Sequence, residues 1–190
     1  MRPLEYYNEW LSGNLGSGLD DDQLVAFFVI GTHLYENKGK SVIDTAPLRM
    51  IISGPGGTGK SEIINHVTRY SHVIGMKHAV IVLAMYGSAA YLVGGQTFHS
   101  GVPRFGKDSA VSMDEKDAWL GVLVVLIDEY GTVGQNSLEK LNNSLKKVSG
   151  LQVRKKLWPR VIIDRPESCG GIGIRGWRRE YELTGHLIWW

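Results

Sequence analysis

Eight consecutive residues have the types and the spacing needed to hold a triphosphate. They are Gly54, Pro55, Gly56, Gly57, Thr58, Gly59, Lys60 and Ser61, and they fill the pattern G-x-x-x-x-G-K-[ST]. Glycines let backbone N–H groups turn inward around phosphate oxygens, at angles and distances that a Cβ resists. The Lys60 ammonium can then reach the β- and γ-phosphates, and the Ser61 hydroxyl can bind Mg²⁺. The pattern predicts a nucleoside triphosphate site, with a chance glycine-rich turn as the alternative.

A second chemical signal is the pair of carboxylates Asp128 and Glu129, which follows the apolar run Val122 to Ile127. A carboxylate at the end of such a strand can hold Mg²⁺ through water, the role expected for Asp128. Its neighbour Glu129 can polarise an attacking water. A solvated turn is the alternative, but the phosphate-binding pattern upstream favours hydrolysis of a triphosphate.

These groups need elements that bring them to one edge of a sheet. Three apolar runs, Leu48 to Ile52, His78 to Ala84 and Val122 to Ile127, predict buried strands. We expect helices from about Asp21 to Tyr35, from Gly59 onward, and from about Val133 to Val148, and loops over residues 1–18 and 103–117. This order predicts an α/β fold of three αβα layers with a mainly parallel sheet.

Composition narrows the class of protein further. The 190 residues suffice for one α/β domain, and Cys169 is the single cysteine, which excludes a disulfide framework or a cysteine-based metal site. The longest apolar run, Leu24 to Ile30, is seven residues, too short to span a membrane. Residues 151–190 carry 8 Lys and Arg against 4 Asp and Glu, so this basic tail could meet a polyanion or simply be solvated. We expect an intracellular protein without a membrane partner.

Several segments, taken in order, resemble the PIF-type (petite integration frequency) DNA helicases of superfamily one, which are ATP-driven motors on single-stranded DNA. Besides the phosphate loop, the similar segments are residues 19–23, 84–90, 94–100 and 128–133. The resemblance implies a RecA-like ATP-binding domain over residues 19–150, with ATP and Mg²⁺ as cofactors and single-stranded DNA as partner. It implies that Gln23 reads the adenine edge.

The same resemblance implies a DNA path. Tyr86, Gly87 and His99 would lie on this path. Tyr86 could stack on a base, or it could be a core aromatic. For His99, a structural role is the alternative to contact with DNA.

The resemblance ends near residue 150. Gly170, Gly171 and Ile172 are similar to the family's entry to its next strand, but the expected G-D-x-x-Q segment is replaced by residues 173–179. We therefore expect residues 151–190 to be a divergent tail, out of frame or mis-spliced. A nucleic-acid patch around Arg175, Arg178 and Arg179 is the alternative.

The function implied is that of an ATP-dependent DNA helicase in repair, recombination or telomere maintenance, in the nucleus or alternatively the mitochondrion. Lys60 and Glu129 would be catalytic, and Ser61 and Asp128 would bind the metal. Motors of this class close ATP between two RecA-like domains, and the second supplies arginines worth roughly 10³–10⁵ in turnover. With that donor unknown, the isolated chain is expected to be weak or inactive. The alternatives are a non-catalytic nucleotide- or single-strand-binding fragment and a small P-loop kinase with the tail arginines as its lid.

Overall fold

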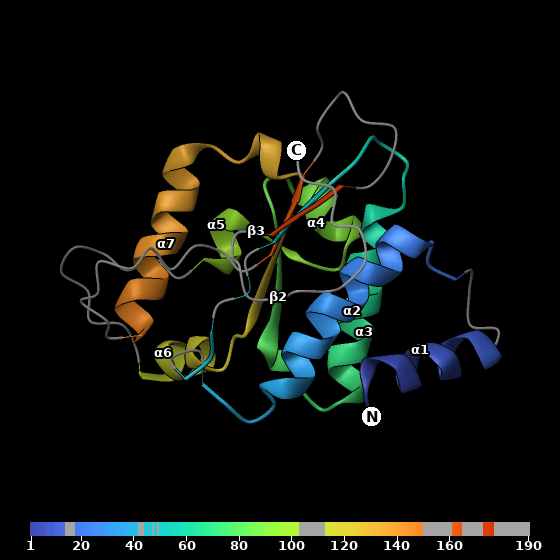
Figure 1. Cartoon of the computed structure of the whole chain (residues 1–190). Helices are drawn as coiled ribbons and strands as arrows, with labels where there is room; N and C mark the ends of the chain where they lie inside the picture. The colour runs from blue at the N-terminus through green and yellow to red at the C-terminus, as the bar shows by residue number, and fades with distance from the viewer. Residues whose placement is uncertain are drawn as a thin grey trace.

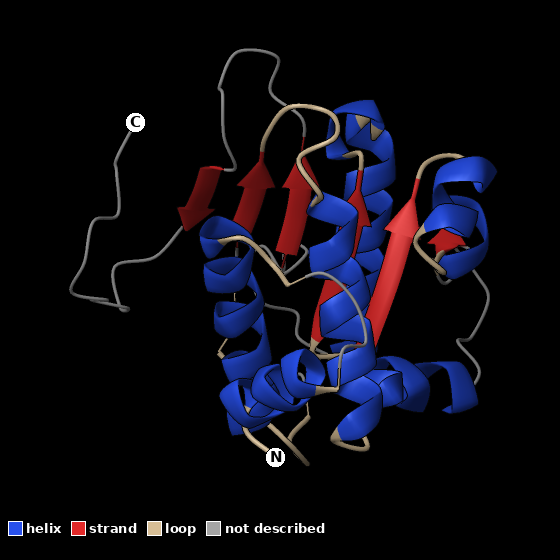
Figure 2. Ribbon diagram, turned by 90° about the vertical axis from the view of Figure 1, so that its right-hand side faces the viewer, coloured by secondary structure: helices blue, strands red, loops and turns tan. Residues whose placement is uncertain are grey.

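The computed structural model describes residues 1–13, 18–41, 44–46, 48, 50–102, 113–149, 161–164 and 173–176. Their strands form a six-stranded sheet in the order β3-β2-β4-β5-β1-β6. The strands are β1 (Met50–Ser53), β2 (Val80–Ala84), β3 (Gln96–Thr97), β4 (Val124–Asp128), β5 (Val161–Asp164) and β6 (Gly173–Gly176). Strands β1 to β5 pair in parallel, whereas β6 runs antiparallel to β1 at one edge (Figure 2). The predicted mainly parallel sheet is confirmed.

The central strands are apolar on both faces. In β4, Val124 and Leu126 belong to one buried cluster, and Val125 and Ile127 belong to the other. Successive side chains of a strand point to opposite faces, so a continuous apolar run has to be covered from both sides. Helices therefore pack on each face, and the sheet is the middle of three layers (Figure 1).

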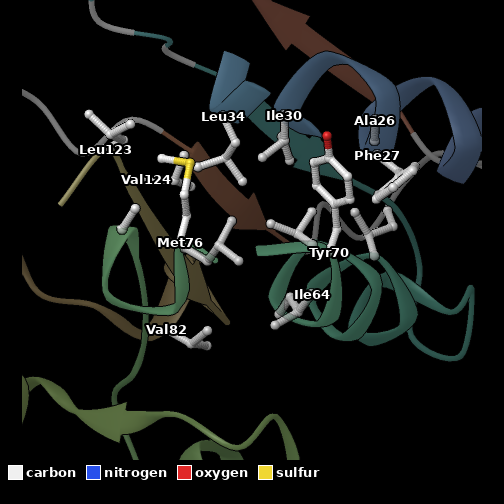
Figure 3. Close-up of a cluster of buried hydrophobic side chains, with 14 of the residues drawn as sticks. Ala26, Phe27, Ile30, Leu34, Ile64, Tyr70, Met76, Val82, Leu123 and Val124 are labelled. Carbon is white, nitrogen blue, oxygen red and sulfur yellow. The ribbon is translucent and has the colours of Figure 1, made fainter. Parts of the chain in front are cut away.

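The first face is covered by α1 (Pro3–Ser12), α2 (Asp21–Glu36) and α3 (Lys60–Val73). Phe27 of α2 and Tyr70 of α3 are fully buried, with ring centroids 5.8 Å apart (Figure 3). The opposite face is covered by α5 (Phe98–Gly101), α6 (Met113–Leu120) and α7 (Gln135–Ser149). Helix α4 (Gly87–Leu92) and the 3₁₀ turns Lys77–Ala79 and Tyr130–Thr132 complete the described elements.

The start of α2 is fixed by a capping box. The Asp20 carboxylate accepts the Gln23 backbone N–H at 2.8 Å, and the Gln23 side-chain oxygen accepts the Asp20 N–H at 3.0 Å. Each contact satisfies a donor that the first turn of a helix leaves without a partner. The Asp20 carboxylate therefore fixes where α2 begins, and the Asp20 backbone N–H holds the Gln23 side-chain amide.

Helix α1 replaces most of the loop expected over residues 1–18. Pro3 suits the first helical position, and the Glu5 carboxylate accepts the Arg2 N–H at 2.8 Å. Gly13 follows the last helical residue, and the aromatic residues of the helix pack on α2 and α3. Tyr6 packs against Phe27 with the rings tilted by 41° and their centroids 5.7 Å apart, so this helix buries surface that α2 would otherwise expose.

A histidine is buried beneath α1. His66 of α3 is 2% exposed and lies among the rings of Tyr6, Tyr7, Trp10 and Phe27, at centroid distances of 4.9 to 6.3 Å. Its Nδ1 has no hydrogen-bond partner. Burial lowers the pKa of His66, the nearby Glu62 raises it, and Arg69, whose guanidinium lies 4.6 Å from the Trp10 ring, lowers it.

One further segment differs from expectation, and two strands lie in a stretch whose assignment as a divergent tail stays a prediction. Residues 113–117, expected in a loop, are helical as part of α6; the rest of that predicted loop, residues 103–112, lies outside the described residues. Strands β5 and β6 come from the stretch assigned to a divergent tail, and β5 occupies the slot between β4 and β1. The pairing of β5 with both neighbours completes backbone hydrogen bonding in the middle of the sheet. None of the helices that the structure describes is long and apolar enough to cross a membrane.

Candidate nucleotide-binding site

The predicted chemical groups gather at the carboxyl edge of the sheet, where the parallel arrows point in Figure 2. Ser53 ends β1 and leads into the glycine loop, and Asp128 ends β4. One strand, β5, lies between them, and its last residue pairs in register with Ser53. Open α/β sheets place their ligands outside this edge. The topology therefore brings together two segments that lie about 70 residues apart in the sequence.

The loop between β1 and α3 is built around two glycines in the left-handed region. Gly57 has φ 82° and Gly59 has φ 72°, conformations that residues with a Cβ seldom adopt. Gly59 is the N-cap residue of α3 and directly precedes the first helical residue, Lys60. The Thr58 hydroxyl donates a hydrogen bond to the Pro55 carbonyl at 2.9 Å, which closes the loop on itself.

The Lys60 side chain lies over this loop. Its Nζ donates hydrogen bonds to the carbonyl oxygens of Gly54 and Pro55, at 2.7 and 2.6 Å, and is 3.3 Å from the Thr58 hydroxyl oxygen. The ammonium is therefore held at the mouth of the loop, beside the start of α3. The N-terminus of that helix adds partial positive charge to the same place.

The carboxylate of Asp128 is partly buried at the end of β4. Its Oδ1 accepts the Glu129 backbone N–H at 3.0 Å. Burial raises the pKa of Asp128; the Glu129 N–H and the Lys60 charge lower this pKa, and the Glu129 charge raises it. The Lys60 charge is the smallest of these four influences on the pKa of Asp128, which is consistent with a lysine that lies across the edge rather than in contact.

Glu129 is exposed and has φ 52°, the one positive φ of a non-glycine residue among those that the structure describes. The Thr132 N–H and hydroxyl both donate to the Glu129 carbonyl, at 2.9 and 2.8 Å. Those contacts hold a conformation that costs of order 1–3 kcal/mol in a non-glycine residue. The strained turn directs the chain away from the strand immediately after Asp128.

The donor set at this edge suits Mg²⁺. The exposed Ser61 hydroxyl and the Asp128 carboxylate are hard oxygen ligands. Within the described residues no group of three or more His, Cys, Asp or Glu could hold a metal ion on its own. Mg²⁺ usually takes one or two protein ligands and completes its shell with phosphate oxygens and water, which fits a sparse protein site.

Gln23 lies beside the loop from the other direction. It is 8% exposed, and its Nε2 donates a hydrogen bond to the Thr58 carbonyl at 2.9 Å. The structure thus places the predicted adenine reader in contact with the phosphate loop itself. Sequence reasoning missed this contact, because Gln23 and Thr58 are 35 positions apart and no local pattern links them.

The residues predicted to contact DNA follow β2 and β3 along the same sheet. Tyr86 is 55% exposed, Gly87 begins α4, and His99 is exposed on α5. The exposure of Tyr86 makes its interpretation as a core aromatic wrong. Tyr91 and Leu92, at the end of α4, are 86% and 79% exposed and were not singled out by sequence reasoning.

Of the tail arginines, Arg175 lies on β6 at the position that pairs with Ile51. Arg178 and Arg179 lie outside the described residues, so the arginine patch and the kinase lid that depended on them stay predictions.

Comparison with known proteins gives consistent matches. The model of the PIF1-like helicase family matches residues 31–163. The ATP-dependent DNA helicase RRM3 of Saccharomyces cerevisiae is 33% identical over a match of 105 residues, and the match covers 50% of this chain and 14% of that protein. Among solved structures, Bacteroides Pif1 bound to ssDNA has a TM-score of 0.57 at 20% identity, and the match covers 79% of this chain and 32% of that one.

A Bacteroides Pif1 helicase in complex with ADP-AlF3 and ssDNA has a TM-score of 0.55 at 20% identity, with 79% and 32% of the two chains covered. The chain therefore spans about a third of the length of these structures and a smaller part of RRM3. The structural likeness confirms the predicted fold, an α/β unit that matches part of the RecA-like region of Pif1.

Proposed function

Because the chain belongs to the PIF1-like helicase family, we propose that the described unit binds Mg-ATP and hydrolyses it as part of a DNA helicase. The observation that carries this proposal is the arrangement at the carboxyl edge. The Lys60 ammonium lies on a glycine loop at the start of α3, and Asp128 ends β4 at the same edge of the sheet. This combination of cation, helix N-terminus and carboxylate suits a metal-bound triphosphate.

The residues divide the chemistry among them. The loop N–H groups and Lys60 bind the phosphates and spread the charge that develops on the transferring group. Ser61 and Asp128 would hold Mg²⁺, which would neutralise negative charge on the phosphates when bound. Glu129, exposed beside Asp128, would orient and polarise the attacking water. Gln23 would contact the base.

DNA would pass along the segments that follow β2 and β3. The proposal places Tyr86, Gly87 and His99 there, and the exposed ring of Tyr86 can stack on a base without sequence preference. The two matched Bacteroides structures are of Pif1 helicases bound to ssDNA, which supports single-stranded DNA as the partner. Service in repair, recombination or telomere maintenance, in the nucleus or mitochondrion, is part of the same proposal.

Two substitutions test nucleotide binding and turnover separately. Lys60→Ala removes charge-assisted contacts worth about 1.5–3 kcal/mol each, so we expect Mg-ATP affinity measured by calorimetry to fall at least about tenfold. Glu129→Gln keeps the side-chain shape and removes the base, so we expect binding to persist while ATP hydrolysis falls about 10²–10⁴-fold.

Hydrolysis should be measured with and without single-stranded DNA. We expect DNA to stimulate turnover of the wild-type chain and not of Glu129→Gln. Turnover of the isolated 190 residues is expected to be slow, because transition-state arginines are worth about 10³–10⁵ in comparable enzymes and their donor is unknown here. Unchanged Mg-ATP affinity in Lys60→Ala would refute the phosphate-loop assignment.

A further inference from the structure

Both the oxygen and the nitrogen of the Gln23 side-chain amide form hydrogen bonds with the protein. Its oxygen accepts the Asp20 N–H at 3.0 Å, and its nitrogen donates to the Thr58 carbonyl at 2.9 Å. The residue is 8% exposed, so neither contact is open to easy exchange with water. The capping box of α2 therefore aims a polar group at the last turn of the phosphate loop.

Gly59 makes this close approach possible. A Cβ built on Gly59 would collide with the Gln23 nitrogen and lie 3.5 Å from its Cδ, whereas a Cβ on Gly57 would meet nothing within 4 Å. The amide of Gln23 thus occupies the space beside Gly59 that a side chain would take. The last two residues before α3 are held from α2 rather than by the loop alone.

Thr58 connects Gln23 to Lys60 through its carbonyl and its hydroxyl. Its carbonyl accepts from Gln23, while its hydroxyl donates to the Pro55 carbonyl at 2.9 Å and lies 3.3 Å from the Lys60 Nζ. Lys60 also donates to the Pro55 carbonyl. A continuous hydrogen-bonded path therefore runs from the N-terminus of α2 through Gln23 and Thr58 to the ammonium that would meet the phosphates.

We propose that Gln23 is a positioning residue for the phosphate loop. By holding the loop, Gln23 raises the affinity of the site for the polyphosphate itself, whatever base is attached. The inference rests on the proposed nucleotide-binding function and adds a second role to Gln23. An amide nitrogen carries two N–H groups and its oxygen two lone pairs, so these contacts leave capacity for a base as well. The two roles are separable by a ligand that has no base.

The test compares Mg-ATP with Mg-tripolyphosphate, which carries the phosphates alone. Gln23→Met keeps the length of the side chain and removes its hydrogen bonds. We expect the variant to bind Mg-tripolyphosphate about 2- to 12-fold more weakly, the equivalent of one hydrogen bond of 0.5–1.5 kcal/mol. Mg-ATP should lose at least as much affinity, because it also loses the contact between Gln23 and the base. Affinities are measured by calorimetry on the full 190-residue chain, and folding is checked by circular dichroism.

Asp20→Ala is the matched control. It removes the carboxylate that caps α2 but keeps both side-chain hydrogen bonds of Gln23, because the Gln23 oxygen accepts the backbone N–H of residue 20. We therefore expect its affinity for Mg-tripolyphosphate to stay within twofold of wild type. If Gln23→Met does not fold, Gln23→Asn, which keeps an amide that is too short to reach Thr58, replaces it in the same comparison.

The outcomes separate this inference from the function on which it rests. Weaker ATP binding with unchanged tripolyphosphate binding would show that Gln23 acts on the base alone, which overturns the inference. An equal loss in Asp20→Ala would assign the effect to the stability of α2 and would also overturn it. A wild-type chain that binds neither ligand would instead refute the proposed nucleotide site.

Discussion

Gly59 and Gly57 offer a matched pair of substitutions on the phosphate loop. Both have positive φ, 72° and 82°, so alanine at either position adopts a left-handed conformation that costs about 1–2 kcal/mol. Only at Gly59 does the added Cβ meet another residue, the Gln23 amide, whose displacement breaks its hydrogen bond to Thr58. That bond is worth about 0.5–1.5 kcal/mol.

We therefore expect Gly57→Ala to lower the free energy of unfolding by about 1–2 kcal/mol and Gly59→Ala by about 1.5–3.5 kcal/mol. The assay is urea denaturation followed by circular dichroism, without nucleotide, so that ligand binding does not contribute. A change in the midpoint at constant slope would identify a change in stability rather than in the unfolded state.

A double-mutant cycle identifies the cause. In a Gln23→Ala background the clash is absent, so Gly59→Ala should cost only as much as Gly57→Ala, and the coupling energy should be about 0.5–1.5 kcal/mol. Equal costs for the two glycine substitutions in the wild-type background, or a coupling energy near zero, would refute the packing of Gln23 against the loop.

Three further predictions use other parts of the molecule. Burial lowers the pKa of His66, so below about pH 6.5 the unfolded state takes up a proton that the folded state does not. The free energy of unfolding should therefore fall from pH 7.5 to 5.5, by at most about 1.4 kcal/mol per pH unit. In His66→Leu the free energy of unfolding should depend less steeply on pH. An unchanged pH dependence of the unfolding free energy in His66→Leu would contradict the burial of a neutral imidazole. Glu129→Gly should be about 1 kcal/mol more stable than Glu129→Ala in the same assay, because glycine alone holds φ 52° without cost, and equal stability would argue against strain there. Tyr86→Ala should weaken binding to a fluorescent oligothymidine by about 1–3 kcal/mol, whereas Tyr35→Ala, at the far end of α2, should not; equal losses would exclude specific stacking by Tyr86.

The success of sequence reasoning followed the range of the interactions involved. Helix α2 was expected from Asp21 to Tyr35 and runs to Glu36, because its acidic start and apolar spacing are local signals. Strand β4 was expected from Val122 to Ile127 and runs from Val124 to Asp128, because a continuous apolar run is also a local signal. Helix α1 was missed, since its aromatic residues are explained only by the surface of α2 and α3 on which they pack.

The sequence by itself determined the chemical content of the site: the order of the loop residues, the lysine and hydroxyl at the start of α3, and the two carboxylates after an apolar run. These patterns lie within a few residues, where steric and hydrogen-bonding preferences of the backbone suffice. The tertiary structure alone decided that β5 lies between β4 and β1 and that Gln23 contacts Thr58. Such contacts join distant segments, and they form only when burial of both faces of the sheet fixes which strands and helices are neighbours.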